Sequence, residues 1–162
     1  ELKRFHNLIN NWQNFKIAPF LQTYQELFQS LPSWEREQEV IAEAEKLFTK
    51  QPQVLLHNDL IDGNILINGE IVKLIDFEYI GVGYYGFDIA AFLTEREINL
   101  NQTIIFLKQF PIIEEKELMI LKLFMICFWG KWALNSWLTT KEVKFKTIYD
   151  LKVKQYENEL KK

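Results

Sequence analysis

The sequence confines its β-forming residues to one short central stretch, and this restricts the chain to few folds. Residues 54–56, 64–67 and 70–75 are apolar runs rich in Val, Ile and Leu, and Asn68-Gly69 is a favoured two-residue hairpin turn. On both sides of this stretch, apolar residues recur at three- and four-residue spacing, as in amphipathic helices. The chain is therefore predicted to be a mostly helical α+β protein with a small central β-hairpin.

Seven helices are predicted around the hairpin from this periodicity and from the positions of the prolines. They span Leu2–Phe15, Phe20–Leu31, Trp34–Lys50, Phe87–Glu97, Thr103–Phe110, Glu114–Thr139 and Glu142–Lys161. Ser33 is the predicted N-cap of the third helix. We interpret residues 1–162 as a single lobe. It has a helical lead-in (1–52), a segment of catalytic loop, hairpin and metal motif (53–97), and C-terminal helices (98–162).

Composition excludes several classes of protein. A net charge of −3 gives no basic footprint, so no nucleic-acid partner is expected. Cys127 is the only cysteine, which argues against disulfides and favours a reducing, cytoplasmic location. Residues 118–138 have the length of a membrane span, but Lys122 and Lys131 lie within them, so a buried helix without membrane insertion is predicted.

The most informative stretch is H57-N-D-L-I-D-G-N64, followed by I75-D-F-E78. Phosphoryl transfer needs a carboxylate that orients and deprotonates the attacking hydroxyl, and hard oxygen ligands for Mg²⁺. Asp59 can supply the base, and Asn64 and Asp76 can supply the ligands once the hairpin folds the chain back. Gly63 is predicted to let the loop turn before Asn64.

An alternative reading makes these residues ordinary turn formers beside a hairpin. An isolated H-x-D would fit that reading. The full spacing, H-x-D-x-x-x-x-N, then a hairpin, then I-D-F, is far more specific and favours the catalytic interpretation. His57 is interpreted as bracing the loop, Asp62 as solvated, and His6 has no motif around it.

The segments HNDLIDGNIL, KLIDFEYI and GFDIAAF resemble the C-terminal lobe of choline/ethanolamine kinases, which are protein-kinase-like enzymes related to aminoglycoside phosphotransferases. Asp88 follows Asp76 by twelve residues and Glu95 follows Asp88 by seven, as in that family's pattern. The resemblance implies Mg²⁺ and ATP as the co-substrate. It also implies that Asp88 braces the catalytic loop and that Glu78 adds a further metal or second-layer contact.

The same resemblance implies a cation pocket. Choline carries a quaternary ammonium group without N–H donors, so aromatic faces and a carboxylate must hold it. The family's W-x-x-W pattern matches Trp129 and Trp132, with Tyr149 on the next helix and Glu95 as the carboxylate. Taken alone, the two tryptophans would be read as core packing, because their helix is apolar throughout.

The resemblance therefore implies a choline kinase-like phosphotransferase that forms phosphocholine, for phospholipid or surface-glycan synthesis. The alternatives are an ethanolamine or aminoglycoside phosphotransferase, or a non-catalytic remnant that binds a choline-like cation. No glycine precedes His57, so the nucleotide lobe of this family is expected to be absent. The start at Glu1 suggests a piece of a longer kinase. We expect the chain alone to be inactive, and its uncovered apolar surface to favour homodimers.

Gly81–Gly86 reads G-V-G-Y-Y-G, the pattern of loops that hold nucleotide phosphates. In a kinase such a loop precedes the H-x-D motif, whereas this one follows it. A Rossmann fingerprint would open a parallel βαβ unit, which the sequence does not predict. We therefore interpret the segment as a connector whose glycines turn the chain from Asp76 into the helix that carries Asp88.

Overall fold

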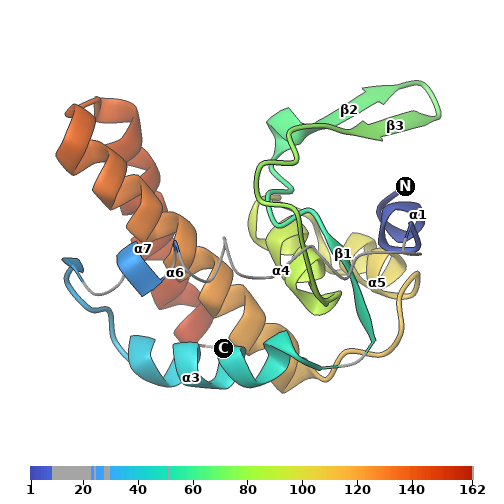
Figure 1. Cartoon of the computed structure of the whole chain (residues 1–162), viewed down its shortest axis with the longest axis horizontal. Helices are drawn as coiled ribbons and strands as arrows, with labels where there is room; N and C mark the ends of the chain where they lie inside the picture. The colour runs from blue at the N-terminus through green and yellow to red at the C-terminus, as the bar shows by residue number, and fades with distance from the viewer. Residues whose placement is uncertain (9–22, 24, 28–29, 51, 162) are drawn as a thin grey trace.

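The computed structural model describes residues 1–8, 23, 25–27, 30–50 and 52–161. The predicted helices over 2–15 and 20–31 fall mostly outside these residues, and of the first only α1 (Leu2–His6) is described. The described elements form two small antiparallel sheets and a set of helices, in agreement with the predicted α+β class (Figure 1).

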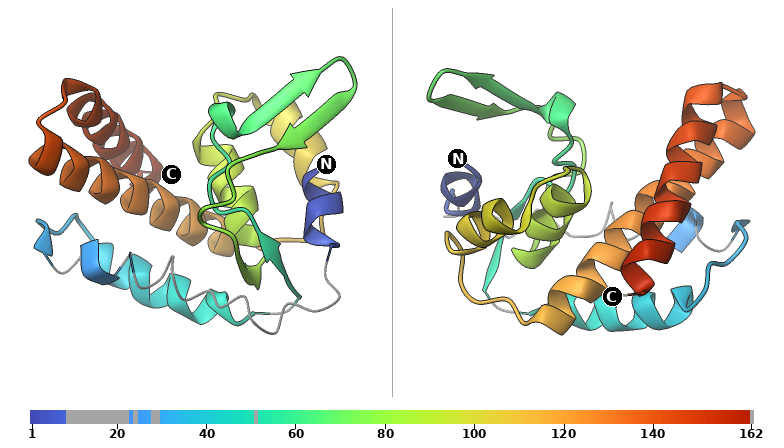
Figure 2. Two further views of the ribbon diagram at one scale, coloured as in Figure 1. Left: turned by 45° about the horizontal axis from the view of Figure 1, so that its top comes forward. Right: turned by 180° about the vertical axis from the view of Figure 1, so that it is seen from behind.

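The central hairpin is present, with its turn displaced by one residue. Strands β2 (Ile65–Asn68) and β3 (Ile71–Leu74) pair in register from Ile65 opposite Leu74 to Asn68 opposite Ile71. The two central turn residues are therefore Gly69 and Glu70, not the predicted Asn68 and Gly69. Gly69 has a φ of 58°, which a primed turn requires at its first central position and which glycine adopts without strain. The hairpin projects from the body of the molecule (Figures 1 and 2).

The prediction of a turning connector at Gly81–Gly86 was wrong, because this segment forms a strand. β4 (Gly81–Tyr84) pairs antiparallel with β1 (Gln53–Leu56) and leads directly into α4 (Gly86–Thr94). A Cβ atom at Gly86 would lie 2.7 Å from both Leu121 Cδ1 and Tyr84 Cε1. Close packing of α4 on its neighbours explains this glycine, and the antiparallel pairing agrees with the rejection of a Rossmann unit.

Helix α3 (Glu37–Phe48) begins three residues later than predicted, and Ser33 is not its N-cap. The N-cap is Arg36, at a left-handed φ of 55°. Glu37 fixes this start, because its carboxylate accepts a hydrogen bond from the Trp34 N–H at 2.5 Å. The same carboxylate pairs at 2.9 Å with Lys131 Nζ, and both side chains are buried.

Helix α4 ends three residues earlier than predicted, and α5 (Leu100–Leu107) begins three residues earlier. Asn99 starts α5 through a capping box: its side chain accepts from the Gln102 N–H at 3.0 Å, and the Gln102 side chain accepts from the Asn99 N–H at 2.9 Å. The reciprocal pair satisfies N–H groups that a helix start leaves without partners.

Helices α6 (Glu115–Thr140) and α7 (Val143–Leu160) form an antiparallel pair that packs on α3 and α4 (Figures 1 and 2). The middle of α6, including Cys127, lies in the hydrophobic core. Two of the lysines in this apolar helix form ion pairs, Lys131 with Glu37 and Lys122 with Glu159. Among the described helices, none is both long and apolar enough to cross a bilayer.

Candidate active site

One buried carboxylate anchors the loop between β1 and β2. Asp88, fully buried on α4, accepts hydrogen bonds from the backbone N–H groups of His57 at 2.9 Å and Asn58 at 2.8 Å. It also accepts from His6 Nε2 on α1 at 2.9 Å. No sequence pattern singled out His6, because its partner Asp88 lies 82 residues away. Three donors on one carboxylate fix the start of the loop relative to α1 and α4.

Within the loop, Asn64 clamps Asp59. The Asn64 side-chain amide donates to Asp59 Oδ2 at 2.7 Å and to the Asp59 carbonyl at 2.9 Å. Both residues are buried, and burial raises the pKa of Asp59 against the opposing effect of the Asn64 hydrogen bond. Gly63 lies in the 3-10 turn η1 (Asp62–Asn64) without a left-handed φ, so its predicted conformational role was wrong.

The segment after β3 is tied to the same loop at two points. His57 Nε2 donates to the Ile75 carbonyl at 2.9 Å, and the Asn58 side chain donates to the Tyr79 carbonyl at 2.8 Å. Between these anchors, Asp76 is exposed and has a φ of 61°, a conformation that costs free energy in any residue with a side chain. Asp76 and Glu78 both raise the pKa of Asp59 through charge repulsion, which places all three carboxylates in one region.

Two hard oxygen donors are available for a metal ion here. Both N–H directions of the Asn64 amide point at Asp59, so its Oδ1 faces away from that bond, and the Asp76 carboxylate is exposed. Among the described residues, no group of three His, Cys, Asp or Glu side chains could hold a metal ion alone. This donor set fits Mg²⁺, which keeps several waters and is bound by few carboxylates together with substrate phosphates.

Arg96, which sequence reasoning missed, secures the outer side of the loop. Its Nη1 donates to the Leu60 carbonyl at 2.6 Å, and its Nη2 pairs with Asp62 Oδ1 at 2.9 Å. The guanidinium lies 4.3 Å from the ring centroid of Phe92, and burial lowers the pKa of Arg96. Asp62 itself is exposed, as predicted for a solvated residue. No sequence signal marked Arg96, because its partner is a backbone carbonyl 36 residues earlier.

An aromatic row runs from this loop region along α6. Tyr79 meets Trp129 edge-on with ring centroids 5.5 Å apart, Trp129 meets Trp132 at 5.7 Å, and Trp132 meets Phe145 at 5.4 Å. Trp129 and Trp132 were predicted to share a wall, and their rings are in contact. Tyr79 and Phe145 were not predicted. Tyr79 begins the row next to Glu78 in the sequence, and burial raises the pKa of its hydroxyl.

Two further residues of the predicted cation pocket have other partners. Glu95 Oε1 lies 2.6 Å from Lys152 Nζ, so its charge is already paired. The ring contact of Tyr149 is with Trp34, at a centroid distance of 6.0 Å. The described structure therefore brings the two tryptophans together but does not gather all four predicted residues around one open space.

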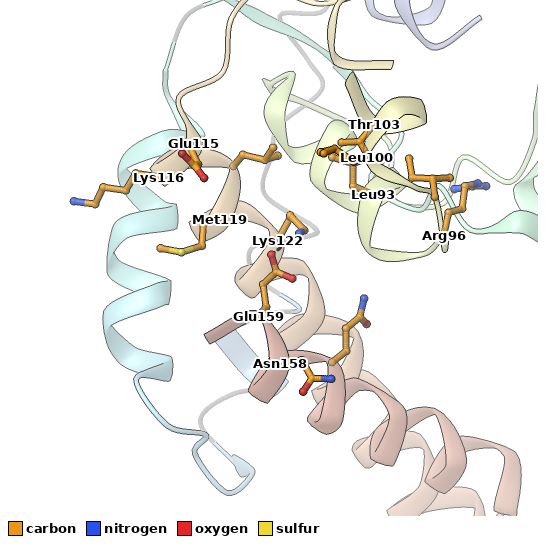
Figure 3. A pocket seen from close by; sticks show the side chains of 13 residues that line it. Leu93, Arg96, Leu100, Thr103, Glu115, Lys116, Met119, Lys122, Asn158 and Glu159 are labelled. Carbon is orange, nitrogen blue, oxygen red and sulfur yellow. Dashed lines mark hydrogen bonds and ion pairs between the residues drawn. The ribbon is translucent and has the colours of Figure 1, made fainter. Parts of the chain in front are cut away.

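A cavity of about 870 Å³ lies elsewhere, between the end of α4, the start of α5, the first turns of α6 and the last turns of α7 (Figure 3). Its lining includes Arg96, Lys122 and Glu159 and none of the predicted site residues. The candidate catalytic and metal-binding side chains of the H-x-D loop therefore lie outside this cavity. Arg96 connects the two regions, because it lines the cavity and donates a hydrogen bond to the Leu60 carbonyl of the loop.

A helical lobe whose buried aspartate holds an H-x-D-x-x-x-x-N loop next to a hairpin and a second aspartate defines a protein-kinase-like small-molecule kinase. The model of the choline/ethanolamine kinase family matches residues 2–109, and the chain belongs to that family.

Curated relatives match over short segments. A probable ethanolamine kinase from Arabidopsis thaliana is 42% identical over 76 residues, which are 44% of this chain and 20% of the relative. The human choline/ethanolamine kinase is 46% identical over 46 residues, 25% of this chain and 12% of the relative.

Solved structures match over nearly the whole chain. Choline kinase LicA from Streptococcus pneumoniae superposes with a TM-score of 0.72 at 18% identity, covering 97% of this chain and 60% of that one. A choline/ethanolamine kinase family protein from Mesorhizobium loti gives 0.71 at 18% identity, covering 99% and 59%. At this identity the likeness establishes the fold, and the chain spans about 60% of each of these two chains.

Proposed function

We propose that this chain is the C-terminal lobe of a kinase that transfers the γ-phosphoryl group of ATP to the hydroxyl of choline, giving phosphocholine. The observation that carries the proposal is the clamp of Asn64 on Asp59, 2.7 Å between Nδ2 and Oδ2. The clamp orients one carboxylate oxygen of Asp59 and leaves the amide oxygen of Asn64 directed away from that bond. One loop thus offers a base and a metal ligand together.

In the proposed mechanism, Asp59 accepts a hydrogen bond from the substrate hydroxyl, aims its oxygen at the phosphoryl group and takes up its proton. The raised pKa of Asp59 makes it a better proton acceptor than an exposed aspartate. Asn64 and Asp76 would hold Mg²⁺, with Glu78 as a further contact, and the ion would neutralise the charge that develops on the phosphates. Asp88 and His57 keep these groups in place through the bonds described above.

The proposed substrate choline would lie along the aromatic row, with its ammonium against Trp129 and Trp132. Tyr79 joins this row to the loop, because its ring contacts Trp129 and its carbonyl is bonded to Asn58. A quaternary ammonium is attracted to such faces without needing N–H donors. Glu95 and Tyr149 would complete the pocket in the bound state.

Ethanolamine is the second candidate, and one observation favours it. Glu95 already holds a primary ammonium, that of Lys152, through an N–H donor at 2.6 Å. Ethanolamine could form the same hydrogen bond, whereas choline could not. One of the curated relatives is named a probable ethanolamine kinase.

We also propose that catalysis needs a nucleotide lobe in addition to these residues, that the enzyme acts in the cytoplasm, and that this chain alone associates as a homodimer. One of the matching solved structures is LicA in complex with AMP, which agrees with nucleotide use by proteins of this fold.

The hairpin exposes Leu66, Ile67 and Ile71, at 49%, 71% and 59% of their residue surface, and this apolar surface supports the proposed dimer. Light scattering of the 162-residue chain tests the dimer, and a single monomeric species contradicts it.

A coupled assay of ATP consumption by the full-length enzyme tests the function. Choline, ethanolamine and an aminoglycoside are compared at equal concentration, each with and without Mg²⁺. We expect turnover with choline that depends on Mg²⁺. Exclusive turnover of ethanolamine would select the second candidate, and no turnover with any of the three alcohols would contradict the proposed class of substrate.

A further inference from the structure

We propose that Lys152 is a built-in counter-ion of Glu95 that occupies the cation end of the substrate site and lowers the selectivity of the site for charged alcohols. The inference rests on the proposed function, because it assumes that Glu95 faces the substrate's ammonium group. The ion pair is short, 2.6 Å, and only 10% of the Lys152 side chain and 17% of the Glu95 side chain are exposed. A pair so far removed from water is poorly screened, so its charges strongly affect any ligand beside it.

Lys152 lies against the helix that carries the two tryptophans. Its Cβ is 3.2 Å from the point that a Cβ at Gly130 would occupy, and Gly130 lies between Trp129 and Trp132 in the sequence. From there the side chain reaches the carboxylate of Glu95, directly after the end of α4. Lys152 thus connects the aromatic part of the predicted pocket to its acidic part, where the ammonium of a substrate would lie.

A second acceptor allows Lys152 to leave Glu95. Lys152 Nζ also donates to Gln155 Oε1 at 3.3 Å. Gln155 is held in turn, because its Nε2 donates to the Thr94 carbonyl at 2.7 Å. When a ligand takes Glu95, the lysine keeps one fixed hydrogen-bond partner, so the cost of breaking the ion pair is reduced.

The Lys152–Glu95 ion pair should reduce the preference of the site for cationic over uncharged alcohols. With Lys152 bound to Glu95, the acidic end of the site is neutral and attracts a cation weakly. Choline has no N–H to replace the lysine's hydrogen bond, so it must compete through the aromatic faces and charge alone. The wild-type site should therefore distinguish poorly between choline and its uncharged isostere 3,3-dimethylbutan-1-ol.

Isothermal titration calorimetry of the full 162-residue chain with these two alcohols tests the inference. Lys152→Met keeps the length of the side chain and removes its charge. We expect it to bind choline about tenfold more tightly and the isostere within about twofold of wild type. Adding Glu95→Gln to Lys152→Met should abolish the gain. If Lys152→Met does not fold by circular dichroism, Lys152→Gln replaces it.

Lys122→Met is the matched control, because it breaks a different lysine–glutamate pair, that of Lys122 on α6 with Glu159 on α7, without touching Glu95. We expect it to leave the affinity for both alcohols unchanged. If choline binds wild type and Lys152→Met equally, or if both alcohols gain by the same factor, the inference is overturned and the proposed function stands. If neither wild type nor any variant binds choline, the proposed choline site fails together with the inference.

Discussion

The predicted catalytic loop and the predicted cation pocket are built in different ways. The loop, residues 57–64, is held by hydrogen bonds between its own side chains and by backbone N–H groups that converge on Asp88. The pocket residues come from three helices, and Glu95 pairs with Lys152 while Tyr149 contacts Trp34. The loop has its hydrogen-bond partners within this chain, both near and distant in sequence, whereas two of the predicted pocket residues have other partners.

The largest expected effect tests the loop. Asp59→Asn in the full-length enzyme should lower kcat by at least about a thousandfold, because the base that accepts the substrate proton is lost. Choline affinity should change little, since Asp59 is not part of the aromatic row. Steady-state kinetics and calorimetry separate the two quantities. Retention of more than about a tenth of wild-type kcat would exclude Asp59 as the base.

Asp88→Asn should produce the next largest effect, on stability. The amide would turn an N–H₂ group toward donors that need an acceptor, at a cost of about 3 kcal/mol in the free energy of unfolding. Urea denaturation, monitored by tryptophan fluorescence, measures this loss in the free energy of unfolding. Asp150→Asn, which alters an exposed pair with Lys146, should cost less than about 0.5 kcal/mol. Equal effects of the two variants would show that Asp88 does not carry the loop.

Gly130, between the two tryptophans of the predicted pocket, and Gly63, in the loop, allow the tightness of packing in the two regions to be compared. A Cβ at Gly130 would lie 2.3 Å from Trp34 Cη2, so Gly130→Ala must displace this indole. We expect a cost of about 2 kcal/mol. At Gly63 the nearest atom, Ile61 Cδ1, is 3.9 Å away, so Gly63→Ala should change stability by less than about 0.5 kcal/mol. Thermal melts of both variants measure this, and the reverse order would contradict the packing argument.

Trp129→Ala should weaken choline binding by about tenfold, through loss of one aromatic face. Trp129 is only 8% exposed, so circular dichroism must first show that the variant folds. Trp137→Ala removes a half-buried tryptophan further along α6 and should leave the choline affinity unchanged. Equal choline affinity of wild type and Trp129→Ala would remove the aromatic row from the substrate site.

The sequence was most informative where spacing along the chain decides geometry. The hairpin, the long pair of helices and the contact between Trp129 and Trp132 all follow from local periodicity. The hairpin turn was displaced by one residue because Asn68-Gly69 and Gly69-Glu70 are both acceptable turns. Pairing of β2 with β3 chooses between them.

The remaining features depend on contacts that no local pattern reveals. His6 contacts Asp88 from 82 residues away in sequence, and Arg96 reaches the Leu60 carbonyl of the loop from 36 residues away. The segment Gly81–Gly86 was interpreted as a connector whose glycines turn the chain, whereas its first four residues form β4, paired with β1. No sequence pattern marked Lys152 on α7, and only the three-dimensional packing places its ammonium beside Glu95.

The smallest expected effect is a pH dependence that belongs to the loop alone. Burial raises the pKa of Asp59 in the folded state above its unfolded value, so the folded state binds more protons between the two values. The ionised carboxylate therefore lowers stability as the pH rises through this window, and Asp59→Asn removes that loss. The stability of the variant relative to wild type should increase as the pH rises from about 3 to 7. Urea denaturation at intervals across this range measures the difference, because all other titrating groups are common to both proteins. A difference that stays constant or shrinks with rising pH would mean that the clamp from Asn64, which favours the ionised form, outweighs the burial of Asp59.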